Sequence, residues 1–305
     1  MRSSVPINYS IIIPHKDIPE LLVRCLDSIP EREDIQVVVV DDCSRDFDVF
    51  LNKFPEHTRS RVDIYISKEG KGAGYARNIG LKFARGKWVL FADADDFFLP
   101  GWLTVTDRYL DTDADVIQFR IDDVLNKDDC GWHNKKLDKY RDGQMTARDV
   151  LLTNVTCWAK MLRLDFLRKN QLTFEEVRFG NDVLFGVKVA VHASAIMIVQ
   201  KPIYDVTYRE GSLTTIKNAD TLRCRFEAQK RADAYASKFG FKQFELPCAI
   251  DHLKTWREFG LRNYLHFVWK ERKEIKRAKK IRLDTKPFNF RHPYLYVILV
   301  LFRFL

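Results

Sequence analysis

The chain has 305 residues, enough for one large domain or two domains of ordinary size. Hydrophobic residues make up 46% and charged residues 30%, so the composition is that of a soluble globular protein rather than a low-complexity or repeat protein. The formal net charge is +9, with much of the excess near the C-terminus.

Strands and helices alternate over the first hundred residues. Short apolar runs predict strands, and apolar residues at helical spacing predict helices. The expected strands are 9–13, 36–40, 62–66 and 87–92, and the expected helices are 19–28 and 75–84. This alternation predicts an α/β fold, with a mainly parallel sheet flanked by helices on both faces.

The middle of the chain is more mixed. Periodicity predicts helices at 145–152, 164–169 and 181–191, and strands at 116–121 and 195–199. The polar segment 122–143 is expected to form loops or a short hairpin. From about residue 218 the chain becomes helical and charged, which predicts a domain 1–216 followed by a helical C-terminal region 217–305.

Three carboxylates follow the apolar run 87–92 directly: Asp93, Asp95 and Asp96. Carboxylates this close repel one another, and burial would raise their pKa values. A divalent cation would relieve the repulsion, and hard oxygen ligands suit Mg²⁺ or Mn²⁺. The alternative is a solvated acidic turn before Pro100.

Polar residues follow two other predicted strands as well. Pro14 and His15 follow the first strand, and Asp41 and Asp42 end the second. Ligands bind beyond the carboxyl ends of strands in open parallel sheets. Three such ends together indicate a ligand site.

A loop with two glycines, Gly72 and Gly74, opens the helix that carries Arg77. Glycines allow close backbone approach to a phosphate, and a helix N-terminus offers free N–H donors. Arg77 could hold a phosphate, or it could form an ion pair with one of the aspartates beyond the next strand.

The C-terminal region combines a basic stretch, 270–282, with an apolar tail, 293–305. The tail is too short to span a bilayer as a helix. The combination predicts docking on an anionic membrane surface, with packing on the protein itself as the alternative. A nucleic-acid partner is not expected, because no nucleic-acid-binding motif is present.

The cysteines and the N-terminus bear on the compartment. Residues 1–6 contain no apolar segment typical of a secretory signal, and no two of the six cysteines form a C-x-x-C pair. We therefore expect reduced thiols in a cytoplasmic protein, and no structural zinc site.

Five segments resemble the GT-A glycosyltransferases of family 2 in order and spacing: 10–14, 22–28, 37–46, 74–80 and 91–96. The resemblance is strong over about the first 105 residues and weaker to about residue 215. It implies a GT-A fold in which a nucleotide-sugar lies across the strand ends.

The resemblance also implies roles for single residues. Asp41, with Asp42 beside it, matches the aspartate that binds the base, typically uracil. Asp93 matches the ribose contact and Asp95 the ligand of the diphosphate-bound metal, with Asp96 adjacent. Gly74 and Arg77 fall in the segment that orients these groups, and Asp182 matches the general base.

Two further positions are assigned less firmly by the resemblance. Trp158 stands where the family often has an acceptor-side aromatic residue, although a core tryptophan is an equal alternative. Arg209 matches a segment near the diphosphate and could bind phosphate oxygens. For Asp182, the alternative to catalysis is a helix N-terminal acid favoured by the macrodipole.

The chain departs from the family pattern at three positions. Many members carry an aromatic residue that covers the base where this chain has His15. Cys43 replaces a usual glycine, and Asn181 replaces the glutamate that usually precedes the base.

The resemblance as a whole implies sugar transfer with inversion, assisted by Mn²⁺ or Mg²⁺ and without a covalent enzyme intermediate. A UDP-type donor and a saccharide or lipid-linked acceptor are expected, in the synthesis of a surface polysaccharide or glycolipid at the inner face of the cell membrane. The alternative is an inactive GT-A-fold scaffold in a polysaccharide assembly complex, against which the intact Asp93, Asp95 and Asp182 count.

Overall fold

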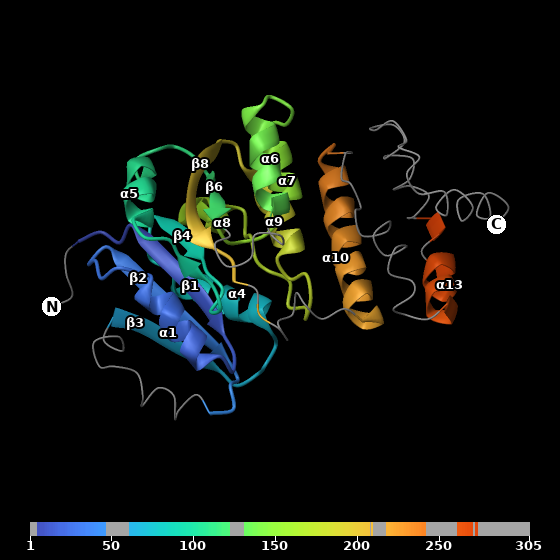
Figure 1. The fold of residues 1–305 in the computed structure, drawn as a ribbon, viewed down its shortest axis with the longest axis horizontal. Helices are drawn as coiled ribbons and strands as arrows, with labels where there is room; N and C mark the ends of the chain where they lie inside the picture. Colours follow the sequence, from blue (N-terminus) through green and yellow to red (C-terminus); the bar gives the residue numbers. More distant parts are fainter. Residues whose placement is uncertain are drawn as a thin grey trace. The chain divides into compact units, whose positions relative to one another are not determined.

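The computed structural model describes residues 5–46, 61–122, 131–207, 209, 218–241, 261–270 and 272–273. The chain forms two compact units, Met1–Phe244 and Glu245–Leu305. The first unit contains the sheet and the candidate site (Figure 1). Within it, helix α10 (Ala219–Lys238) packs on helix α9 (Val183–His192), while the predicted boundary at residue 216 stays a prediction.

The second unit is described only at α13 (Leu261–Lys270) and residues 272–273. Most of the basic stretch and all of the apolar tail therefore lie outside the described residues. No helix in the described ranges is long and apolar enough to cross a membrane.

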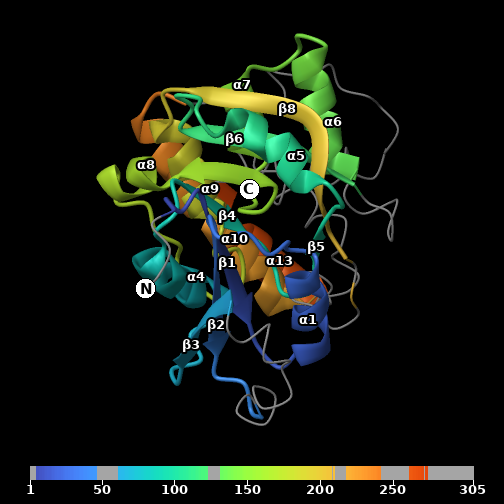
Figure 2. The ribbon, with the colours of Figure 1, turned by 90° about the vertical axis from the view of Figure 1, so that its left-hand side faces the viewer.

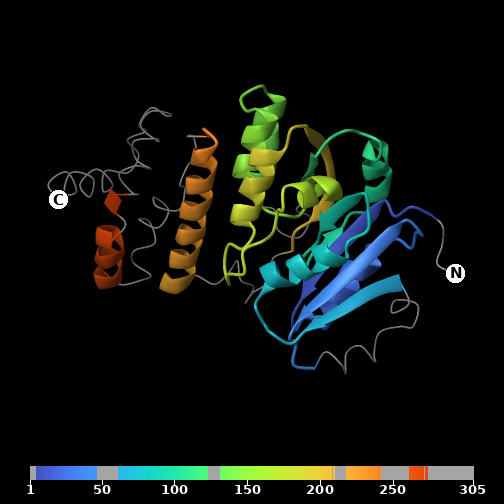
Figure 3. The same ribbon diagram turned by 180° about the vertical axis from the view of Figure 1, so that it is seen from behind.

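One eight-stranded sheet runs through the first unit in the order β3-β2-β1-β4-β7-β6-β8-β5. Its strands are β1 (Tyr9–His15), β2 (Ile35–Asp42), β3 (Val62–Ser67), β4 (Trp88–Phe91), β5 (Phe97–Phe98), β6 (Val116–Asp122), β7 (Lys160–Arg163) and β8 (Ile196–Asp205). β3, β2, β1 and β4 are parallel, as are β6 and β8, whereas β7 is antiparallel to β4 and β6, and β5 to β8. The predicted α/β architecture is confirmed, with a mixed sheet whose parallel half is seen from behind in Figure 3.

The two faces of the parallel strands are covered by different helices. Alternate residues of β1 and β2 point to opposite faces. Ile11 and Val37 pack with α1 (Pro19–Asp27), whereas Ile12 and Val38 belong to the cluster that includes Ala76 of α4 (Ala73–Phe83). Figure 2 shows α1 and α4 on opposite sides of these strands.

The remaining helices complete the two layers. α5 (Trp102–Thr106), followed by a short 3-10 turn (Asp107–Tyr109), packs on the α1 side through Trp102 and Leu103. On the other side lie α7 (Ala147–Thr153), α8 (Leu164–Lys169), α9 and α10, through buried residues such as Leu151, Phe166 and Phe185.

Several elements differ from the sequence predictions, among them β5 and α5, which were not predicted. The expectation of loops or a hairpin over 122–143 is wrong for α6 (Gly131–Arg141). This helix buries only His133 and Leu137, too few apolar contacts for its periodicity to stand out. The four-residue strand β7 was not predicted, because it is short and basic at both ends.

A close contact fixes α9 against the chain that leads into β7. A Cβ at Gly186 would lie 2.2 Å from the carbonyl oxygen of Val155, so the helix can approach this backbone only with a glycine. The buried neighbours of Gly186 on α9, Phe185 and Val187, then reach the core.

We expect Gly186→Ala to lower the free energy of unfolding by about 1–3 kcal/mol, because the added methyl group overpacks against backbone that cannot move aside. Denaturant titration measures this change. Gly131→Ala, in α6, is the matched control, since among the described residues its Cβ would meet only the end of Lys135, at 4.0 Å. The free energy of unfolding of the control should stay within about 0.5 kcal/mol of the unmodified protein's value. An equal loss in both variants would contradict the prediction.

Candidate active site

The carboxyl ends of β1, β2 and β4 meet at one edge of the sheet. His15 is paired with Asp41 in the β1–β2 register, and Phe91 at the end of β4 is paired with Ile12. Asp93 follows two residues beyond Phe91. The three polar strand ends predicted from the sequence are therefore brought together, while Pro14 itself is buried within β1, opposite Val40.

Both carboxylate oxygens of Asp41 are hydrogen-bonded to other residues of the protein. The Nδ1 atom of His15 lies 2.8 Å from its Oδ2, and Ser44 donates from its backbone N at 2.9 Å and from its Oγ at 2.5 Å. The backbone N of Ile18 donates to His15 Nε2 at 3.2 Å, so Nδ1 carries the proton and donates to Asp41. Burial alone would raise the pKa of Asp41, but the hydrogen bonds from His15 and Ser44 lower it. Asp41 is thus an ionised, fully buried carboxylate.

Asp42 differs from its neighbour in having an open acceptor. Its Oδ2 accepts a hydrogen bond of 2.8 Å from the backbone N of Gly72, and the Nζ atom of Lys16 lies 3.8 Å away. Its Oδ1 is buried and has no hydrogen-bond partner among the described residues. An unsatisfied buried acceptor is costly, so Oδ1 is a candidate acceptor for a ligand donor.

The Asp93–Asp96 segment is a turn held by the end of β8. The backbone N of Asp96 donates to Asp93 O at 3.0 Å. The Tyr204 hydroxyl accepts from the backbone N of Asp93 at 2.8 Å and donates to Asp96 Oδ2 at 3.0 Å, and the backbone N of Thr207 donates to Asp96 Oδ1 at 2.8 Å. Burial, and then the nearby Asp93 and Asp95, raise the pKa of Asp96 well above its usual value. Asp96 therefore supports the turn from inside.

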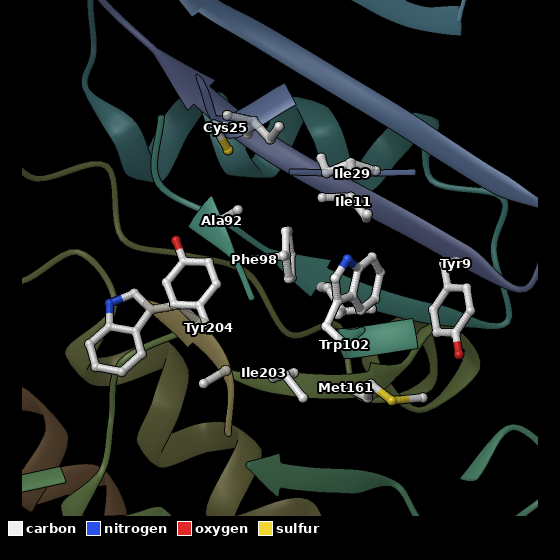
Figure 4. Packing of buried hydrophobic residues seen from close by; sticks show 14 of the residues in the cluster. Tyr9, Ile11, Cys25, Ile29, Ala92, Phe98, Trp102, Met161, Ile203 and Tyr204 are labelled. Atoms are coloured by element: carbon white, nitrogen blue, oxygen red, sulfur yellow. The ribbon is translucent and has the colours of Figure 1, made fainter. Parts of the chain in front are cut away.

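Tyr204 was missed at the sequence level. The predicted strand ended at residue 199, because Lys201 and Pro202 interrupt the apolar pattern, whereas β8 continues to Asp205 through a register shift against β6. Tyr204 belongs to a line of buried rings with Phe98, Trp102 and Tyr9 (Figure 4). This packing fixes the hydroxyl beneath the aspartate turn.

Arg77 forms the ion pair that the sequence left as one alternative. Its Nη2 lies 2.5 Å from Asp93 Oδ1, and its Nη1 donates to Asn181 Oδ1 at 2.8 Å. The guanidinium is buried and packs over the Phe174 ring at 5.3 Å. Gly74, one turn earlier, allows this approach, since a Cβ there would lie 2.1 Å from Glu175 O.

Asp95 is the candidate metal ligand. Its Oδ2 lies 3.3 Å from Arg209 Nε, and Arg24 donates to its backbone oxygen. Burial, followed by the charge of Asp93, raises the pKa of Asp95, as expected for a carboxylate that lacks a full counter-charge. No group of three or more His, Cys, Asp or Glu residues in the described ranges could hold a metal ion. The carboxylate oxygens of Asp95 are hard ligands of the type that suits Mg²⁺ or Mn²⁺, which usually bind through one or two carboxylates and substrate phosphates.

Asp182 stands at the N-cap position of α9. Its side chain makes no capping hydrogen bond within the described part of the chain, so capping does not explain its place. Burial raises the pKa of Asp182, while the charge of Arg77 opposes that rise. A carboxylate with a raised pKa can accept a proton near neutral pH.

Trp158 and Lys160 lie on the other side of Tyr204. The Trp158 ring is 7% exposed and stacks on Tyr204 with centroids 6.1 Å apart, a packing that matches the core alternative. Lys160 donates to the carbonyls of Asn154, at 2.8 Å, and Thr156, and burial lowers its pKa to about 7. The acceptor-side role of Trp158 stays a prediction.

Comparison with known proteins identifies a family. The model for glycosyl transferase family 2 matches residues 10–170. The poly(ribitol-phosphate) beta-N-acetylglucosaminyltransferase TarS of Staphylococcus aureus (strain MW2) is 27% identical over 213 residues, which cover 67% of this chain and 36% of that protein. This chain thus spans about a third of the length of TarS. The succinoglycan biosynthesis protein ExoO of Rhizobium meliloti is 25% identical over 290 residues, which cover 90% of this chain and 80% of that protein.

Solved structures share the fold. Residues 1–349 of S. aureus TarS in complex with UDP-GlcNAc give a TM-score of 0.65 at 22% identity, covering 85% of this chain and 79% of that one. The mannosyltransferase PcManGT from Pyrobaculum calidifontis, in complex with GDP-Man and Mn²⁺, gives a TM-score of 0.54 at 15% identity. The match covers 93% of this chain and 89% of that one. The expected GT-A architecture is confirmed.

We expect Tyr204→Phe to lower the free energy of unfolding by about 1–3 kcal/mol, because the buried Asp93 N–H and Asp96 carboxylate each lose a partner. It should also weaken the binding of UDP with Mn²⁺, measured by calorimetry. Tyr9→Phe is the control, because it removes another buried hydroxyl, bonded to Thr106 and Asp107 at the far end of the ring line. If the two variants bind UDP equally well, Tyr204 does not position the aspartate turn.

Proposed function

Since the chain belongs to glycosyl transferase family 2, we propose that it transfers a sugar with inversion from a UDP-type nucleotide-sugar to a saccharide or lipid-linked acceptor. One observation carries this proposal. Three carboxylates, Asp42, Asp95 and Asp182, keep acceptor capacity open, and the last two lie near the ion pair between the buried Arg77 and the partly exposed Asp93. We assign them to the base, the diphosphate-bound metal and the acceptor, respectively.

The base contact is assigned to Asp42 rather than to Asp41. The oxygens of Asp41 are taken by His15 and Ser44, whereas Asp42 keeps a buried Oδ1 available. Uracil offers one N–H donor on its pairing edge, which suits a single open carboxylate oxygen. Both ring nitrogens of His15 are engaged, by Asp41 and by the backbone N of Ile18, so we do not assign His15 to the base.

Asp95 would hold Mn²⁺ or Mg²⁺, and Asp93 would face the ribose. When bound, the cation neutralises charge on the departing nucleoside diphosphate. Arg209 pairs with Asp95 through a single contact of 3.3 Å and could turn to phosphate oxygens, which guanidinium groups bind in a bidentate manner. The diphosphate would thus lie between a carboxylate-bound cation and this arginine.

Asp182 would accept the proton from the acceptor hydroxyl as that oxygen attacks the anomeric carbon. The new C–O bond forms as the bond to the diphosphate breaks, so the configuration inverts and no covalent enzyme intermediate is needed. The raised pKa of Asp182 supports this role, because a stronger base removes the proton more readily. Trp158, which stacks on Tyr204, would lie on the acceptor side of the site.

The names of the relatives support a setting in cell-surface polymer synthesis. TarS is named for poly(ribitol-phosphate) and ExoO for succinoglycan biosynthesis. We infer a comparable surface polysaccharide or glycolipid acceptor at the cytoplasmic face of the membrane. The basic stretch and apolar tail would then hold the enzyme near lipid-linked acceptors.

We expect Asp182→Asn to lower kcat for sugar transfer by about 10²–10⁴-fold, the usual contribution of a general base. The free energy of unfolding at pH 7 should not fall, because burial disfavours the charge that the variant removes. Asp111→Asn, which changes a fully exposed aspartate, is the control. Full transfer activity in Asp182→Asn, measured as UDP release with acceptor, would contradict the assignment.

The base contact has a separate test. We expect Asp42→Ala to weaken UDP binding about tenfold or more, since a charged hydrogen-bond partner contributes about 1.5–3 kcal/mol. Binding of inorganic pyrophosphate with Mn²⁺ should be unchanged, because the diphosphate contacts lie elsewhere. Calorimetry measures the binding affinity of both ligands. An equal loss of affinity for UDP and for pyrophosphate would mean that Asp42 does not contact the base.

A further inference from the structure

Asn181 connects the donor and acceptor halves of the site. Its Oδ1 accepts from Arg77 Nη1 at 2.8 Å, while Arg77 Nη2 lies 2.5 Å from Asp93. Asn181 is 8% exposed and directly precedes Asp182. A single buried guanidinium is therefore held between a donor-side carboxylate and the residue before the base.

The charges around Asp182 come from three other elements. Arg77 of α4 and Lys160 of β7 favour its ionised form, whereas Asp93, beyond β4, disfavours it. The buried thiol of Cys157 also faces this group. Asn181 adds a hydrogen-bond acceptor to this set without adding a charge, so it orients Arg77 and leaves its positive charge undiminished.

We propose that Asn181 is a positioning residue that holds Arg77 between Asp93 and Asp182 while leaving the arginine charge to be shared by those two carboxylates. This inference rests on the proposed function, in which Asp182 is the base. A carboxylate at position 181 would satisfy the same Arg77 nitrogen but would neutralise it. The resemblance implies a glutamate there in related enzymes, so this chain would differ from them in how its base is tuned.

The close packing around Asn181 makes this geometry rigid. A Cβ at Gly74 would lie 2.9 Å from Asn181 Cβ, and the backbone oxygen of Asn181 accepts from Glu175 N at 3.2 Å. The Arg77 guanidinium is also fixed by packing over the Phe174 ring. A change of charge at position 181 would therefore act on Asp182 mainly through electrostatics.

The test is the pH profile of kcat for Asn181→Asp. We expect its acid limb to move up by about one pH unit, because a like charge beside a carboxylate raises that carboxylate's pKa. At pH values on the limb the rate should fall about tenfold, with the plateau at high pH nearly unchanged. Gln171→Glu is the control, since it adds the same charge at an exposed position and should leave the limb in place.

A folded Asn181→Asp variant with an unmoved limb would overturn the proposal. Asn181→Ser covers the case in which the first variant does not fold, because it removes the hydrogen bond to Arg77 without adding charge. Asn181→Ser should lower kcat several-fold and leave the acid limb of the pH profile at the same pH. An unchanged kcat in this variant would likewise overturn the proposal. Full transfer by Asp182→Asn would instead refute the proposed function itself.

Discussion

The ion pair between Arg77 and Asp93 is the interaction on which the site depends. Burying a guanidinium without a partner costs several kcal/mol, so the chain must deliver a carboxylate to it with good geometry. That requirement fixes α4 relative to the end of β4. It also makes Gly74 necessary, because the first turn of α4 must come close to the backbone at Glu175.

The same physical rule divides the carboxylates at the strand ends into two groups. Asp41 and Asp96 have both oxygens occupied by internal donors, so they build the framework. Asp42 and Asp182 keep acceptor capacity, and the charged partner of the Asp95 side chain among the described residues is Arg209, at 3.3 Å. Carboxylates left open in a buried setting are the groups available to a ligand.

Much of this arrangement could be predicted from the sequence. The apolar runs of β1, β2 and β4 indicated parallel strands, and the polar residues after them indicated where those strands end. The roles of Asp41 and Asp42 could not be separated, because neighbouring residues on a strand face opposite sides and their partners come from distant segments. Tyr204 was out of reach for a related reason, since a register shift near Pro202 hides the continuation of β8.

Asp182 shows how an open carboxylate can be held in place by the packing of its helix, without a capping hydrogen bond from its side chain within the described residues. Its helix α9 is fixed by packing: Phe185 stacks on Phe174 at 3.9 Å, and both rings meet Phe91 of β4 edge to face. Phe174 also supports Arg77. One aromatic cluster therefore sets the positions of Arg77 and of Asp182, the proposed base, together, which allows the charge of Arg77 to tune the pKa of Asp182.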